Sequence, residues 1–436
     1  MGPNRFEPGS RAILVLFAIL LALAVVAGNA CLVSVSDLTS IDELRANLIG
    51  WNSVHPSSGW ISDWLWHQDA PFKYRILGKL PVWCFYRMGV AFGFAPEPSF
   101  YFAYLLACCM SLALALYALG LFLPRFLVDT GAVLDSRGEM LVAGTGMLLF
   151  SSSAPVLLFS KFPVHGGPND FLGYGLMLSI VYLAWIGRWR ACIAVAMLAA
   201  LCRETTLLAG LMVLFIGGAP MRSRLLVVSS ALAVLAALRL LLPGSYNPFE
   251  AAILNLEVPL QSLAFLFLTL GPLWVVGVLG YRLLKSDLRL DAKDPVRALV
   301  SSFPLALGLS GAITLLLARV REIRILFVLF LYVIPFAMYW LWSCRQRLLA
   351  TVRSAYFGMW ILAAVVLAFR VRVWLMPADA EGHQRMEAVL GTLFTGFVSD
   401  HRFNWISVTV ACFFLSLLGL PLLLAGVISH RDNARR

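Results

Sequence analysis

Long apolar runs, separated by short polar stretches, are the dominant pattern along the 436 residues of this chain. About 20 consecutive apolar residues span the roughly 30 Å hydrocarbon core of a bilayer as an α-helix. Runs of this kind fall at roughly 11–35, 99–123, 140–159, 170–187, 225–242, 259–284, 298–318, 324–343, 354–375 and 403–427. The pattern therefore predicts a membrane-spanning helix for each run.

The stretch 191–218 is also apolar, but Arg203 and Glu204 interrupt it near its middle. A single straight helix would place this charged pair near mid-bilayer, where an unpaired charge costs about 2.5–3.5 kcal/mol. Two short helices that meet at the pair instead put the later basic loops on the same side as the earlier ones. Breaks in a membrane helix occur where the backbone is buried in protein or lines a water-filled cavity. We therefore expect two short helices here, forming a cavity wall.

The predicted fold is an all-α polytopic membrane protein of about twelve transmembrane helices, two of them short. The helices form one transmembrane domain over 1–436, without a soluble C-terminal domain. The segment 36–99 is the first extracytoplasmic loop, and Pro71 to Met88 within it reads as an amphipathic helix lying in the membrane interface. Both termini are expected in the cytoplasm, in a multi-pass protein of the cytoplasmic (inner) membrane.

Composition agrees with a membrane protein. Hydrophobic residues make up 61% of the chain and charged residues 13%, against about 25% charged in soluble proteins. The net charge of +11 comes from short basic clusters between apolar runs, which indicates membrane topology rather than a nucleic-acid-binding face. The eight cysteines show no CxxC or Cys/His spacing, so neither a disulfide framework nor a zinc site is indicated.

The first extracytoplasmic loop carries the acids that could act in catalysis, Asp37, Asp42, Glu43, Asp63 and Asp69. A carboxylate at the membrane surface can act as a general base that deprotonates an acceptor hydroxyl. The alternative is structural, because the spacing from Ser40 to Glu43 is that of a helix capping box.

Basic residues follow these acids closely. Lys73 and Arg75 lie among aromatic residues, where they could hold a lipid-linked phosphate or extend to the surface from an interfacial helix. A tight turn further on holds Lys161, His165 and Asp170 beside several glycines and prolines. Because such a turn needs neither a histidine nor an acid, all three are candidate site residues. The alternative is that the histidine is simply solvated, as a histidine in a loop more often is.

Two further clusters lie within or beside apolar runs, Arg203-Glu204 and Arg321-Glu322-Ile323-Arg324. Charges in such places usually pair with one another or line a pathway. An internal ion-pair network fits Arg203-Glu204 well. It fits the later cluster less well, because arginines there outnumber acids, and surplus guanidinium groups suit a phosphate leaving group.

With these residues in view, the chain resembles the GT-C-type bacterial membrane glycosyltransferases and their uncharacterised relatives. The resemblance rests on the acids of the first outer loop, on Ala-Pro-Phe-Lys-Tyr-Arg-Ile-Leu at 70–77, on Arg-Glu-Thr at 203–205 and on Arg-Glu-Ile-Arg-Ile-Leu at 321–326. It implies a GT-C-like fold, a polyprenyl-phosphate sugar donor, and a basic residue near the outer surface that binds the phosphate. It also implies that Asp42-Glu43 or Asp37 serves as base or orients the acceptor, with Asp69 as a rival.

One departure from that class concerns the acceptor. Many members carry a large C-terminal periplasmic domain, whereas this sequence ends on the cytoplasmic side, so we expect a small or lipid-linked acceptor or an inactive relative. The leading hypothesis is a glycosyltransferase acting outside the cytoplasmic membrane, with a lipid-linked sugar donor and membrane lipids as partners. No nucleic acid, metal or cofactor is expected, since no sequence feature supports a divalent cation. A lipid or polysaccharide transporter or flippase and a non-catalytic membrane scaffold are the alternatives.

Overall fold

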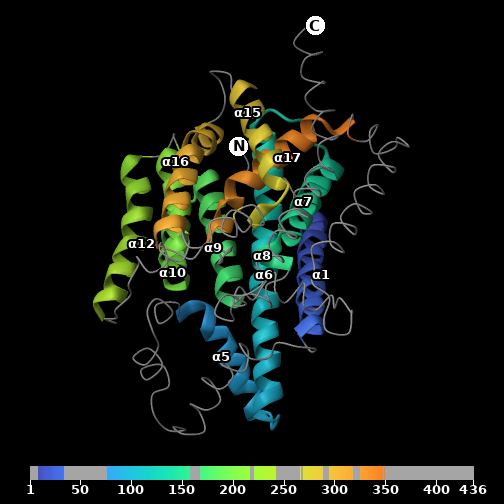
Figure 1. Cartoon of the computed structure of the whole chain (residues 1–436), viewed down its shortest axis with the longest axis vertical. Helices are drawn as coiled ribbons and strands as arrows, with labels where there is room; N and C mark the ends of the chain where they lie inside the picture. The colour runs from blue at the N-terminus through green and yellow to red at the C-terminus, as the bar shows by residue number, and fades with distance from the viewer. Residues whose placement is uncertain are drawn as a thin grey trace, which may run out of the picture.

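The computed structural model describes residues 8–33, 76–157, 167–216, 220–241, 266, 269–287, 294–317, 325–346 and 348. Within these residues every regular element is a helix (Figure 1). The α-helices and the short 3₁₀ helices (η) are α1 (Pro8–Val33), α5 (Ile76–Ala91), α6 (Pro96–Asp129), α7 (Ser136–Ser151), α8 (Ala154–Leu157), α9 (Gly167–Trp185), α10 (Trp189–Cys202), η4 (Glu204–Thr206), α11 (Leu207–Phe215), α12 (Met221–Leu241), α15 (Leu273–Asp287), α16 (Asp294–Leu317), η5 (Leu326–Leu329) and α17 (Phe330–Ser343).

Five helices of this described part are long and apolar enough to cross a membrane: Gly9–Gly28, Pro98–Asp129, Met221–Leu241, Pro295–Leu316 and Leu326–Ser343. Each coincides with an apolar run in the sequence, and α7 and α9 occupy two further runs. The structure thus indicates a multi-pass, all-helical membrane protein. The predicted spans at 354–375 and 403–427 lie outside the described residues.

Helix α6 is the central helix of the bundle. Its 34 residues give a length of about 51 Å, so it extends well beyond the thickness of a hydrocarbon core. Figure 1 shows α1 and α7 on one side of it and α10, α12 and α16 on the other. The buried side chains of α6 include Phe122 and Phe126, whose rings meet the indole of Trp185 edge-on at centroid distances of 5.2 and 6.0 Å.

Helix α5, from Ile76 to Ala91, covers most of the helix predicted over Pro71 to Met88, and residues 71–75 lie outside the described residues. It packs across the lower end of α6 (Figure 1) and buries Val82 and Tyr86, while Leu80 and Met88 stay exposed. The Tyr86 ring contacts the Phe100 ring of α6 at a centroid distance of 6.4 Å. One face of α5 is therefore fixed to the bundle.

Helix directions bring most of the basic residues that the structure describes to one end of the bundle. Helix α9 runs parallel to α6, because the Trp185 Nε1 atom donates to the Asp129 carboxylate at 2.8 Å where both helices end. Helix α10 runs back along α9, since Cys192 donates to the Ile180 carbonyl and Cys202 to the Asn169 carbonyl. We call the end where α6 finishes the basic end; its described arginines and lysines are Arg11, Arg125, Arg137, Arg188, Arg190, Arg222, Arg224, Arg282, Lys285, Arg297 and Arg345.

Helices α15 and α17 pack against each other at two glycines. A Cβ atom added at Gly277 would lie 2.8 Å from the Val333 side chain, and one at Gly280 would overlap the Phe336 carbonyl. Small residues of this kind let two helix backbones approach closely in a membrane. Beyond this contact the Tyr339 hydroxyl donates to the Asp287 carboxylate at 3.0 Å.

Candidate functional site

The polypeptide breaks and reverses direction at Arg203, as the charged pair in the sequence predicts. Helix α10 ends at Cys202, Arg203 is extended (φ −165°, ψ 138°), and a 3₁₀ turn leads into α11. The Thr206 hydroxyl donates to the Arg203 carbonyl at 2.6 Å and so stabilises the turn. A Cβ atom at Gly173 of α9 would lie 3.8 Å from both the Arg203 Cβ and the Thr206 Cγ2 atoms. The segments before and after the break therefore both pack against α9.

The Arg203 guanidinium forms an ion pair with the Asp170 carboxylate in the first turn of α9. Both residues are buried, with 2% of Arg203 and 6% of Asp170 exposed. A carboxylate is favourable at this position because the N-terminus of a helix carries partial positive charge. A buried charge pair depends on its geometry and on further hydrogen bonds to offset desolvation. The pair joins the apex between α10 and α11 to the start of α9.

The sequence named both residues as candidates but did not predict their pairing, since Glu204 was the expected partner of Arg203 and an open cavity its expected surroundings. The signal that could have revealed the pair is the short turn around Gly187, which has a positive φ of 75°. Asp170 and Arg203 lie about equally far from this turn along two antiparallel helices, so they face each other at the same level.

The first loop reaches this site through α5. Gly78 packs directly on Asn169, so closely that a Cβ atom at residue 78 would overlap the Asn169 side chain and backbone. Asn169 is buried, and its Oδ1 atom has no hydrogen-bond partner among the described residues. The first turn of α5, which lies within the basic-aromatic segment 69–80, thus contacts Asn169, the residue before Asp170.

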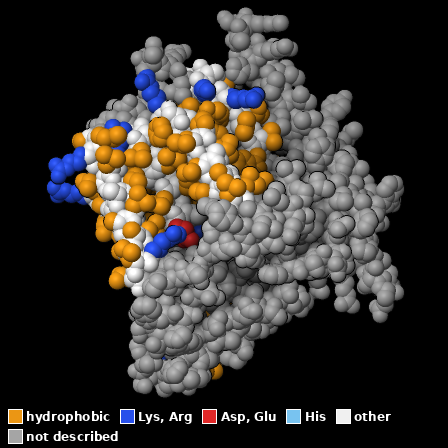
Figure 2. Space-filling model, turned by 60° about the vertical axis from the view of Figure 1, so that its left-hand side comes forward, with side chains coloured by type: hydrophobic (Ala, Val, Ile, Leu, Met, Phe, Trp, Pro, Cys, Tyr) orange, Lys and Arg blue, Asp and Glu red, His pale blue; other side chains and the backbone are white. Residues whose placement is uncertain are grey.

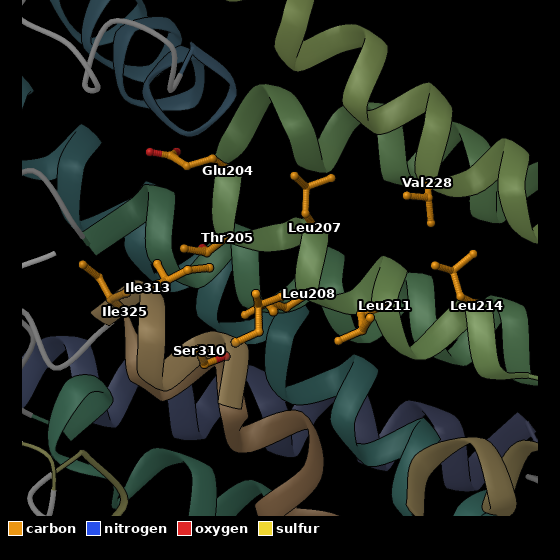
Figure 3. Close-up of a pocket in the computed structure, with 11 residues that line it drawn as sticks. Glu204, Thr205, Leu207, Leu208, Leu211, Leu214, Val228, Ser310, Ile313 and Ile325 are labelled. Carbon is orange, nitrogen blue, oxygen red and sulfur yellow. The ribbon is translucent and has the colours of Figure 1, made fainter. Parts of the chain in front are cut away.

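A pocket of about 260 Å³ lies on the other side of the break, between α11, α12 and α16 (Figure 3). Its polar side chains are Glu204, Thr205 and Ser310. Its apolar walls are formed by Leu207, Leu208, Leu211, Leu214, Val228, Leu309, Ile313 and Ile325. Ile325 directly follows Arg324, the last residue of the late arginine cluster, in the chain.

Three of the predicted site residues therefore come together at the end of the bundle opposite the basic end: Asp170 and Arg203 in the ion pair, and Glu204 at the pocket. The others lie outside the described residues: Asp37, Asp42, Glu43, Asp69, Lys73, Arg75, Lys161, His165, Arg321, Glu322 and Arg324. In the described part of the chain, no group of three or more His, Cys, Asp or Glu side chains is placed to hold a metal ion.

Compared with protein-family models, with curated proteins and with solved structures, the chain shows no match. The resemblance to GT-C-type glycosyltransferases stays a prediction from the sequence motifs.

Proposed function

We propose that the protein is a membrane glycosyltransferase, which transfers a sugar from a polyprenyl-phosphate donor to an acceptor on the extracytoplasmic side. The supporting observation is the convergence of α5 and the Arg203 break at the end of the bundle opposite the basic end. The contact between Gly78 and Asn169 joins the segment after the first-loop acids to the buried Asp170–Arg203 pair. Regions far apart in the sequence thus meet at one end of the bundle, which supports a shared site there.

Roles for individual residues follow from this arrangement. Because Arg203 pairs with Asp170, it acts as a positioning residue that holds the break in place. Binding of the donor phosphate is assigned to Arg75, Arg321 and Arg324. Guanidinium groups suit that task because their planar donors bind phosphate oxygens in pairs. The general base is a first-loop carboxylate, Asp42 or Asp69 ahead of Asp37.

The test is a set of single Asp→Asn variants at positions 37, 42, 63 and 69, assayed for glycan product in membranes and checked for normal expression. A general base contributes typically 10²–10⁴-fold in rate, so one variant should lose most of its activity. Asp135→Asn is the matched control. Asp135 caps α7 at the basic end by accepting from the Gly138 N–H at 2.7 Å, and asparagine caps a helix about equally well.

Full activity in all four variants would exclude the aspartates of the first loop as the general base. The second measurement is then flipping of a lipid-linked sugar by the protein in vesicles. Translocation without transfer would support a transporter, and neither activity would support a scaffold.

A further inference from the structure

Three arginines from different parts of the chain surround one tyrosine at the basic end of the bundle. Tyr182 lies one helical turn before the end of α9. Its hydroxyl group is within the electrostatic reach of three positive charges, those of Arg11, Arg125 and Arg188. Arg11 lies in the first turn of α1, Arg125 near the end of α6, and Arg188 in the turn between α9 and α10. We call Tyr182 and these three arginines the Tyr182 cluster.

Packing of α1 and α9 on α6 brings the members of the cluster together. Helix α1 approaches α6 at Gly120, where an added Cβ atom would lie 3.1 Å from the Leu14 side chain. Helix α9 approaches α6 about half a turn further along, where the Phe122 and Trp185 rings meet. Arg125 follows Phe122 by three residues, so the three helices present their cationic groups at the same level of the bundle. Like charges repel one another, so such an arrangement favours a negative partner.

The described residues offset only part of this positive charge. Asp129 is the described carboxylate that contacts the cluster, and it accepts from Arg125 Nε at 2.9 Å and from Trp185 Nε1 at 2.8 Å. The Arg125 side chain keeps 25% of its surface exposed. Arg11 is half-buried, and its Nε atom is enclosed without a hydrogen-bond partner among the described residues. The charge asymmetry that sets membrane topology requires no such enclosure, so the position of Arg11 indicates a bound acceptor.

The groups of the cluster define the chemistry of that acceptor. Guanidinium groups only donate hydrogen bonds, so the ligand supplies acceptor oxygens and negative charge. A phosphate presents several oxygens in a tetrahedral arrangement and can bind guanidinium groups from different helices at once, whereas a carboxylate presents two oxygens in one plane. A zwitterionic headgroup would bring an ammonium group beside the arginines, where Asp129 is already engaged by two donors. A phosphate without such an ammonium group therefore fits best.

The surface next to the cluster indicates that a lipid carries this phosphate. From Arg11 onward α1 exposes a stripe of apolar side chains, of which Ile13, Leu16 and Leu20 are each more than half exposed. In a membrane this stripe lies against acyl chains. Figure 2 shows the same order on another face of the bundle, with basic side chains at the upper rim of a hydrophobic surface. Basic groups between helices at this boundary are suited to anionic lipid headgroups.

We propose that the Tyr182 cluster binds the phosphate group of an anionic phospholipid, whose acyl chains lie along the exposed stripe of α1. The phosphate accepts from Arg11 and Arg188, while Arg125 stays bound to Asp129 and adds its charge. The lipid thereby links α1 to α9. The cluster lies at the end of the bundle opposite the Asp170–Arg203 pair, so this lipid is neither sugar donor nor acceptor, and the inference does not depend on the proposed function.

The experiment measures lipid binding by the full-length protein, purified in a neutral detergent, with native mass spectrometry. Phosphatidylglycerol is the anionic probe. Phosphatidylcholine tests the effect of the added ammonium group, oleate tests a carboxylate on a hydrocarbon chain, and inorganic phosphate tests a phosphate without a chain. Phosphatidylglycerol is expected to bind at least tenfold more tightly than phosphatidylcholine or oleate, and millimolar inorganic phosphate should not displace it.

Arginine variants locate the site. The double variant Arg11→Gln with Arg188→Gln should weaken phosphatidylglycerol binding at least tenfold, because each lost hydrogen bond to a charged group is equivalent to about a tenfold to hundredfold change. The matched control is Arg137→Gln with Arg222→Gln, which removes the same charge from two exposed residues of the basic end. Its effect should stay below about threefold in 0.15 M salt, where distant charges are screened. Arg11→Lys keeps the charge but loses the planar group, so it should also weaken binding.

Four results would overturn the inference. Equal losses in the two double variants would show a general attraction to the basic end, and an unchanged affinity in Arg11→Lys would show that only charge matters. Equal binding of phosphatidylcholine or oleate would contradict an anionic phosphate as the ligand. Full displacement by inorganic phosphate would show a site for the free ion instead of a lipid.

Discussion

At the scale of single residues, the Asp170–Arg203 pair is the most demanding interaction of the described structure. The two charges are nearly removed from solvent, so each depends on the other for compensation. Replacing a whole buried pair by apolar residues is often neutral, whereas removing one partner leaves an uncompensated charge. Substituting either residue alone should therefore destabilise the fold, whereas substituting both together should be tolerated.

We predict that Asp170→Leu alone and Arg203→Met alone each destabilise the protein by about 3–5 kcal/mol. The double variant should recover most of that loss, because neither charge remains buried without its partner. Thermal unfolding in detergent measures all three. Arg137→Met is the control, since Arg137 is exposed near the start of α7 and a surface change usually stays within about 0.5 kcal/mol. Additive losses in the double variant would show that the two side chains do not interact.

At the scale of helices, the α15–α17 contact depends on the absence of a side chain at Gly280. Since a Cβ atom there would overlap the Phe336 carbonyl, the two helices would have to move apart to admit it. Inserting a carbon into a packed contact costs typically about 1–3 kcal/mol.

We therefore predict that Gly280→Ala lowers the unfolding temperature in detergent. Gly308→Ala supplies the comparison on α16, because a Cβ atom at Gly308 would meet nothing within 4 Å. That variant should be neutral or slightly stabilising, as alanine is the better helix former. Equal effects of the two substitutions would contradict close backbone packing at Gly280.

Helices were largely predictable because each needs only a local apolar run. The positions of α1, α12 and α16 follow the runs closely, and the break at Arg203 follows from two adjacent charges. Helix α6 continues past its apolar run through Pro124 to Asp129, where the Arg125 and Trp185 side chains both donate to the Asp129 carboxylate. That extension depends on a residue of α9, so no local pattern could show it.

The candidate site was predictable only as a set of residue types. Asp170, Arg203 and Glu204 stood out because charges are costly in apolar runs. Their arrangement, with Arg203 paired to Asp170 and Glu204 among the residues that line the pocket, depends on how the helices pack. Ser310 gave no signal at all, because a serine inside an apolar helix is common and usually bonds to its own backbone.

At the scale of the whole molecule, the described basic residues are distributed unevenly between the two ends of the bundle. Positive residues concentrate on the cytoplasmic side of membrane proteins, so the basic end is expected to face the cytoplasm. The break at Arg203 and the turn between α5 and α6 then face outward.

Cysteine labelling tests this orientation with two exposed positions. Phe94 lies in the turn after α5 and is 64% exposed, whereas Ser286 lies near the end of α15 at the basic end. A membrane-impermeant thiol reagent added to intact cells should modify Phe94→Cys and leave Ser286→Cys unmodified until the membrane is opened. The reverse pattern would invert the topology and place the candidate site in the cytoplasm.

The Asp170–Arg203 pair also has a consequence for the biogenesis of the protein. During synthesis Asp170 leaves the ribosome before Arg203 exists, so α9 first meets the insertion machinery with its carboxylate lacking that guanidinium. A lone acid within a membrane segment costs up to about 2.5–3.5 kcal/mol on insertion scales. We therefore expect α9 to enter the bilayer together with α10 as one hairpin, closed at its far end by the ion pair.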